Sequence, residues 1–235
     1  MTGPLVDPED VPAWLQPLVK ISGDVGADTF SRFSVPADAS YRPAAVLMLF
    51  GEGPQGPDVL LQRRADTLGA HAGQVAFPGG GAEPGDGGPV GTALREAEEE
   101  TGLVPSGVQP VAVFPELFVP VSGFAVTPVL AHWRTPSPVH AVDPGETAAV
   151  ARVPIAELAD PANRFQVVRK GFGWKGPAFD VGGMFVWGFT GGLLAMTLSL
   201  GGWERDWDHG DVRELDVALA EHQARVDGRQ VPEKE

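Results

Sequence analysis

Residues 95–103 of the 235-residue chain read Arg-Glu-Ala-Glu-Glu-Glu-Thr-Gly-Leu, which predicts the last turns of a helix with a glycine cap at Gly102. At about 100° per residue, Glu96, Glu99 and Glu100 fall within an arc of about 100° on one helix face. Like charges three or four residues apart destabilise a helix by about 0.2–0.5 kcal/mol, and the helix dipole disfavours anions in the last turns. We therefore expect a ligand that offsets this repulsion.

A divalent metal ion is one such ligand. Mg²⁺ and Mn²⁺ prefer carboxylate oxygens and can keep waters for a substrate phosphate. Arg95 precedes Glu99 by one turn and is within pairing reach of that carboxylate. The alternative is a solvated acidic helix face, which is the commonest environment of a glutamate-rich run. The charge pattern alone leaves both interpretations open.

The segment before this helix, residues 79–89, is the most glycine-rich in the chain, and we expect no regular structure in it. Glycine allows the backbone to approach a ligand closely, and free N–H groups at the start of a helix can accept an anion. Loop, helix and carboxylates together favour a site where a metal ion neutralises a pyrophosphate and water attacks phosphorus.

The remaining pattern predicts one mixed α/β domain. An N-terminal helix and extension are expected at 1–40, the main domain at 41–228 and a short tail at 229–235. Helices are expected at 8–21, 90–101, 154–160, 193–200 and 211–226, and strands at 44–50, 59–62, 108–118, 124–132, near 179 and at 185–187.

Composition excludes several classes of protein. Seventeen Lys and Arg against 31 Asp and Glu give a formal net charge of −14, which excludes a nucleic-acid polymer as partner. The absence of cysteine excludes thiolate metal sites and a cysteine nucleophile. Residues 1–10 carry no basic side chain, and the longest apolar stretch, 184–200, is interrupted by glycine and threonine. We expect no signal peptide, no membrane contact and a cytoplasmic protein.

Two stretches together resemble the Nudix box. Gly-Gly-Ala-Glu at 80–83 is followed by residues 95–103, which match every fixed position of the second half of the box, Arg-Glu-apolar-x-Glu-Glu-x-Gly-apolar. The resemblance implies a Nudix fold, an α+β type of α/β protein with a mixed β-sheet sandwiched between α-helices. It also implies that Glu96, Glu99 and Glu100 bind Mg²⁺ or Mn²⁺ and that Arg95 braces the helix.

One position of the box differs. The earlier glutamate of the family, eight residues before the arginine, would fall at Gly87. Asp86 lies beside it and is the expected substitute. The number of metal ions therefore stays open.

A second motif, residues 60–65 with 71–80, is similar to the signature of the coenzyme A pyrophosphatase branch. This likeness implies cleavage of coenzyme A, or of an acyl form, to 3′,5′-ADP and the corresponding phosphopantetheine. Gln62 stands where threonine is usual, and Gly69 where an arginine is usual. The expected substrate contacts are Arg64, Gly79, Gly80 and Gly81.

We thus expect a metal-dependent hydrolase of a small pyrophosphate substrate, with Glu96, Glu99, Arg95 and Glu146 as catalytic candidates. Glu146 lies in a loop where related enzymes can place a general base, and a solvated turn is its alternative. A pyrophosphatase of ADP-ribose, NADH or another dinucleotide stays open, because the arginine at position 69 is absent. A catalytically idle domain that binds a nucleotide or a protein also stays open, because of Gly87. A homodimer is compatible with the resemblance.

Overall fold

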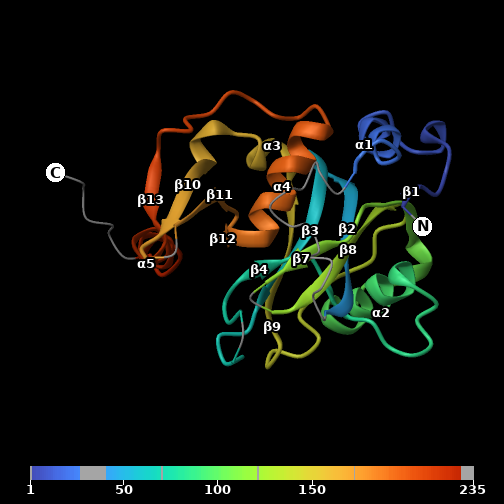
Figure 1. Cartoon of the computed structure of the whole chain (residues 1–235), viewed down its shortest axis with the longest axis horizontal. Coiled ribbons are helices and arrows are strands. Elements are labelled where there is room, and N and C mark those ends of the chain that lie inside the picture. Colours follow the sequence, from blue (N-terminus) through green and yellow to red (C-terminus); the bar gives the residue numbers. More distant parts are fainter. Residues whose placement is uncertain (1, 27–40, 70, 121, 172, 229–235) are drawn as a thin grey trace.

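Figure 1 shows the computed structural model, in which residues 2–26, 41–69, 71–120, 122–171 and 173–228 are described. In these residues the chain forms a nine-stranded sheet and a four-stranded sheet, with helices packed on both. The order of the larger sheet is β1-β6-β8-β2-β3-β4, with β5 paired to β2, β7 to β8 and β9 to β3. The smaller sheet has the order β12-β11-β10-β13.

The strands of the larger sheet are β1 (Gly3–Pro4), β2 (Arg42–Gly53), β3 (Gly56–Arg64), β4 (Val75–Ala76), β5 (Gly79–Gly81), β6 (Val108–Val113), β7 (Leu117–Val119), β8 (Phe124–Trp133) and β9 (Thr147–Pro154). Those of the smaller sheet are β10 (Arg164–Arg169), β11 (Trp174–Val181), β12 (Met184–Val186) and β13 (Val212–Glu214). The α-helices are α1 (Gln16–Ile21), α2 (Pro89–Thr101), α3 (Ile155–Leu158), α4 (Gly188–Leu200) and α5 (Leu215–Val226). Short 3₁₀ turns are η1 (Pro8–Asp10), η3 (Pro105–Gly107) and η4 (Pro161–Asn163).

Strand β2 is the centre of the larger sheet, parallel to β8 and antiparallel to β3 and β5. Successive side chains of a strand point to opposite faces. Leu47 and Leu49 accordingly pack with Ala93 and Ala97 of α2. Met48 and Phe50, which alternate with them in β2, point to the opposite face of the sheet. The mixed sheet between helices that the sequence predicts is therefore confirmed.

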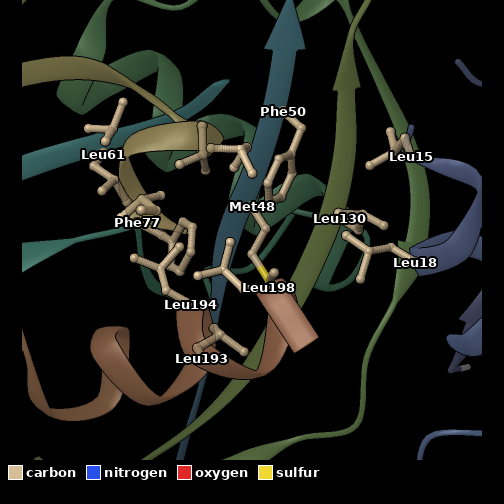
Figure 2. Packing of buried hydrophobic residues seen from close by; sticks show 14 of the residues in the cluster. Leu15, Leu18, Met48, Phe50, Leu61, Phe77, Leu130, Leu193, Leu194 and Leu198 are labelled. Carbon is tan, nitrogen blue, oxygen red and sulfur yellow. The ribbon is translucent and has the colours of Figure 1, made fainter. Parts of the chain in front are cut away.

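The opposite face of β2 packs against α4 and the N-terminal segment, as Figure 2 shows. The side chains that form this packing are Leu15, Leu18, Met48, Phe50, Leu130, Leu193, Leu194 and Leu198. The smaller sheet has a core of its own, where Phe165, Val167 and Ala178 pack against Leu215 and Ala218 of α5. The sequence predicted one sheet, so the second sheet is a finding of the structure.

Helix α2 forms as predicted. Pro89 occupies the first turn, where its missing N–H costs nothing. Gly102 ends the helix in the left-handed conformation, and its N–H donates to the carbonyl of Glu98 at 2.9 Å. Ala93 and Ala97 are fully buried against the sheet, and Arg95 and Glu96 between them lie beside Gly81 and Gly80 of β5.

Several predicted boundaries are wrong. The helix expected at 8–21 is a 3₁₀ turn followed by the short α1, because Pro12 and Pro17 permit no continuous helix across the segment. The strand expected at 108–118 is interrupted before Pro115 and forms β6 and β7. The first residues of the helix expected at 211–226 form β13, an edge strand parallel to β10.

The glycine-rich segment is also more regular than predicted. Gly79–Gly81 pairs with Ala44, Ala45 and Val46 as strand β5, and α2 begins at Pro89. Strands β9 and β10 were not predicted. The expected tail at 229–235 and residues 27–40 of the expected extension lie outside the described residues. None of the helices in the described part of the chain has the length and apolar character to cross a bilayer.

The contact between α2 and the preceding loop predicts a stability effect. A β-carbon at Gly91 would overlap the carbonyl oxygen of Asp86. Alanine favours a helix by about 1 kcal/mol over glycine, but overpacking against backbone costs about 1–3 kcal/mol. We expect Gly91→Ala to lower the midpoint of thermal unfolding by several degrees.

The matched control is Gly69→Ala, because no atom lies within 4 Å of a β-carbon at Gly69. Thermal unfolding followed by circular dichroism compares the two variants. A Gly91→Ala protein as stable as Gly69→Ala would show that α2 does not pack this closely on the loop.

Candidate functional site

The Arg95 guanidinium joins helix α2 to the glycine-rich segment. Its Nε and Nη2 donate to the carboxylate of Asp86 at 2.9 and 3.2 Å, and Nη2 also donates to the carbonyl of Gly81 at 2.9 Å. Its Nη1 donates to Glu96 Oε1 and to Glu99 Oε2, each at 3.0 Å. These bonds, above all that to Asp86, raise the pKa of Arg95. The Arg95 side chain therefore fixes the position of the glycine-rich loop relative to helix α2.

Asp86 is fully engaged by this arrangement. In addition to Arg95, its carboxylate accepts the backbone N–H of Glu83 at 2.9 Å and the hydroxyl of Thr92 at 2.8 Å. The Arg95 hydrogen bond is the main reason that the pKa of Asp86 lies well below its usual value. Asp86, which precedes Gly87, thus holds the Arg95 side chain and the first turns of α2 in place.

Glu96 lies against strand β5, where only glycine leaves room. A β-carbon at Gly80 would overlap the Glu96 carboxylate, so the backbone passes directly beside it. The Glu96 side chain is 17 % exposed, and burial is the main cause that raises its pKa. Its charged form is therefore disfavoured unless a cation is near.

Glu100, one turn after Glu96, is the most buried of the three carboxylates, with 9 % exposure. Its Oε2 accepts hydrogen bonds from Gln62 Nε2 at 2.5 Å and from the N–H of Gly79 at 2.9 Å. Its Oε1 lies 3.8 Å from Arg64 Nη1. Burial nevertheless dominates and raises the pKa of Glu100 to about 7.

The three predicted ligands are brought to one edge of the sheet in two groups. Glu96 and Glu99 meet on Arg95, and the Glu99 side chain is 59 % exposed. Glu100 points toward β3 and β5. Within the described residues, no three histidine, aspartate or glutamate side chains converge closely enough to hold a metal ion in this arrangement. Ligation by all three stays a prediction.

The other predicted residues lie around this edge. Arg64 ends β3 beside Glu100, and its side chain is one-third exposed. Glu146 is exposed, and its carbonyl accepts the N–H of Ala65 at 2.8 Å, which ties its loop to the end of β3. Gly79 contacts Glu100 through its N–H, and Gly81 contacts Arg95 through its carbonyl.

Sequence reasoning missed two polar residues that support Glu100. Gln62 and Thr147 are fully buried, and the Thr147 hydroxyl is 3.2 Å from Gln62 Oε1. Gln62 drew attention in the sequence only as a departure from a motif. The available signal was a polar side chain within the otherwise apolar run of β3, because a buried amide requires partners.

Comparisons with known proteins show which family the chain resembles. The family model described as NUDIX domain matches residues 40–171. The chain is 39 % identical over 155 residues to "Uncharacterized Nudix hydrolase NudL" of Cronobacter sakazakii, covering 65 % of this chain and 79 % of that protein. It is 36 % identical over 157 residues to the protein of the same name from Escherichia coli, covering 66 % of this chain and 80 % of that protein.

Two solved structures are also similar to part of this chain. A Nudix hydrolase from M. smegmatis, RenU, is 28 % identical and covers 51 % of this chain and 74 % of that chain, with a TM-score of 0.42. The NUDIX domain of Shewanella oneidensis NrtR, complexed with ADP ribose, is 18 % identical and covers 57 % of this chain and 86 % of that chain, with a TM-score of 0.41.

The buried Glu100 predicts a pH dependence of stability. Its pKa rises from the ordinary 4.5 to about 7 on folding, so the folded chain binds this proton more tightly than the unfolded chain between these values. The stabilisation that protonated Glu100 provides is complete below about pH 4.5 and is lost as the pH rises to about 7. Glu100→Gln cannot ionise and keeps an oxygen that can accept from Gln62 and Gly79.

We expect the thermal midpoint of Glu100→Gln, measured in a chelator, to exceed that of the unmodified chain by an amount that grows between about pH 5 and about pH 8. Comparing the two proteins at each pH removes the contribution of the other ionisable groups. Parallel curves for the two proteins would show that Glu100 is not held in a dehydrated environment.

Proposed function

Because the chain belongs to the NUDIX family, we propose that it hydrolyses coenzyme A or acyl-coenzyme A to 3′,5′-ADP and phosphopantetheine or acyl-phosphopantetheine. It is a Nudix hydrolase that acts on a small molecule with a pyrophosphate bond. The choice of coenzyme A rests on residues 60–65 and 71–80, the second motif of the sequence.

One observation carries the proposal: a single arginine gathers Glu96 and Glu99 on one edge of the sheet, next to the buried Glu100. Nudix hydrolases generally use divalent metal ions, and this set of carboxylate oxygens has the hard donor chemistry that Mg²⁺ or Mn²⁺ prefers. The raised pKa values of Glu96 and Glu100 also fit a cation site, because a nearby cation favours the ionised form that burial disfavours.

In this proposal Glu96, Glu99 and Glu100 hold Mg²⁺ or Mn²⁺. When bound, the ion lowers the pKa of the attacking water and screens the substrate phosphates from the net charge of −14. Arg95 orients Glu96 and Glu99 through its Nη1.

Further roles follow from exposure and position. Glu99 is open to solvent and suited to accept a proton from the attacking water, and Glu146 is a second candidate base on a loop tied to β3. Arg64, one-third exposed, is the cation that we assign to a substrate phosphate. The glycines of β5 let the substrate approach the backbone.

A second candidate substrate is ADP-ribose, NADH or another dinucleotide. Gly69 is exposed, and no atom lies within 4 Å of a β-carbon built there, so this position offers no side-chain donor to the 3′-phosphate that distinguishes coenzyme A. The idle-domain alternative is less well supported, because Asp86 maintains the brace on Arg95 although Gly87 has no side chain.

The role of Glu99 is tested by Glu99→Gln. The variant keeps an amide oxygen for Arg95 but loses the negative charge and the base, so we expect kcat to fall by at least about a hundredfold. The measurement is divalent-dependent hydrolysis of coenzyme A with the products identified by mass spectrometry. Glu98→Gln is the matched control, because Glu98 is exposed on the same helix and lies off the carboxylate face; it should retain full activity. A Glu99→Gln protein as fast as its parent would contradict the assignment of this helix.

The substrate is tested by a panel of coenzyme A, ADP-ribose and NADH, each with Mg²⁺ and with Mn²⁺. We expect kcat/KM for coenzyme A to exceed that of the other two by about tenfold or more, a difference of about 1.4 kcal/mol in transition-state binding. The diagnostic product is 3′,5′-ADP. Preference for ADP-ribose or NADH would favour the second candidate, and no turnover of any of the three would favour the idle domain.

A further inference from the structure

Gln62 links two buried side chains from different elements. It lies in β3 with no exposed surface, next to Leu60 and Leu61 in the sequence. The Thr147 hydroxyl of β9 contacts Gln62 Oε1 at 3.2 Å, and Gln62 Nε2 contacts Glu100 Oε2 of α2 at 2.5 Å. Because an unpaired buried amide is costly, both ends of the Gln62 side chain are fixed.

The chain of hydrogen bonds has one direction. In the ionised form that binds a cation, the Glu100 carboxylate only accepts, so Gln62 must present its NH₂ group to it. Its carbonyl oxygen then faces Thr147, whose hydroxyl must donate. Reversal of the amide would place two acceptors face to face. Thr147 therefore donates a hydrogen bond to Gln62, and Gln62 donates one to Glu100.

A register shift in the sheet places Thr147 where it can take part. Gln62 is opposite Val150 and Arg63 opposite Ala149, but Arg64 is opposite Thr147 instead of Ala148. Opposed residues of neighbouring strands share a face. The irregularity between Arg63 and Arg64 thus moves Thr147 to the face of Gln62. Bulges of this kind re-aim side chains near functional sites.

The two carboxylate oxygens of Glu100 consequently have different surroundings. Oε2 is held by Gln62 and by the N–H of Gly79, whereas Oε1 lies 3.8 Å from Arg64, beyond hydrogen-bond distance. We propose that Gln62 and Thr147 are positioning residues that fix the Glu100 carboxylate by Oε2 and so present Oε1 to the divalent ion. This inference rests on the proposed function, in which Glu100 is a metal ligand.

The test uses three substitutions of the full chain. Gln62→Met keeps the side-chain length but has no amide, Thr147→Val is isosteric but has no hydroxyl, and Thr147→Ser restores the hydroxyl. Direct Mn²⁺ binding is measured from the electron paramagnetic resonance signal of the free ion, without substrate. The kcat and KM for coenzyme A are measured separately, and circular dichroism verifies the fold.

We expect Gln62→Met to weaken Mn²⁺ binding and to lower kcat by about tenfold each, with little change in KM, because a hydrogen bond to a charged group is lost. Thr147→Val should show the same pattern several-fold, and Thr147→Ser should match the unmodified chain. The double variant Gln62→Met, Thr147→Val should equal Gln62→Met alone, because Thr147 acts through Gln62.

Two results overturn the inference while the proposed function stands. In the first, the unmodified chain is active and binds Mn²⁺, but Gln62→Met and Thr147→Val stay within about twofold of it in Mn²⁺ binding and in kcat. In the second, Thr147→Ser is as impaired as Thr147→Val. If Gln62→Met fails to fold, the comparison of Thr147→Val with Thr147→Ser decides. An unmodified chain that neither binds Mn²⁺ nor hydrolyses any substrate of the panel overturns the proposed function, and this inference with it.

Discussion

The site depends on one guanidinium that satisfies acceptors on both sides of a turn. Arg95 donates to Asp86 and the Gly81 carbonyl of the loop, and to Glu96 and Glu99 of its own helix. A planar fork with five N–H donors can do this, whereas the ammonium group of lysine has three donors and no fork. The arginine also offsets the repulsion between carboxylates that would otherwise oppose the last turns of α2.

Close packing makes this arrangement possible. Gly80 and Gly91 lie where a β-carbon would overlap Glu96 and the Asp86 carbonyl, so the loop, β5 and α2 approach at backbone distance. The carboxylates consequently lose water, and burial raises the pKa values of Glu96 and Glu100. Shifted pKa values of this kind gather at functional sites, because chemistry requires charges where folding alone would not place them.

Local signals in the sequence were sufficient to predict helix α2 and its glycine cap. The helix propensity of residues 90–101, the terminal Gly102 and the spacing of the glutamates involve only near neighbours in the chain, and the structure confirms both the helix and the cap. Strand β5 could not be predicted, because glycine has low strand propensity and its pairing with β2 depends on the close approach of distant residues.

The pairing of β3 with β9 was likewise beyond local reasoning. It joins residues about ninety positions apart, and the partner of Gln62 depends on a bulge that no periodicity reveals. Tertiary pairing therefore decided which polar side chain would support Glu100.

The three glutamates also differ in a way that explains how one helix can provide several functions. Glu99 is 59 % exposed, Glu96 17 % and Glu100 9 %. This gradient follows from the packing of α2 on one face of the larger sheet, because each step of about 100° turns the next residue closer to or further from the core. Water can reach an exposed carboxylate directly, whereas the charged form of a buried carboxylate is disfavoured unless a cation is near. The gradient therefore supports assigning proton transfer to Glu99 and the most rigid ligand position to Glu100.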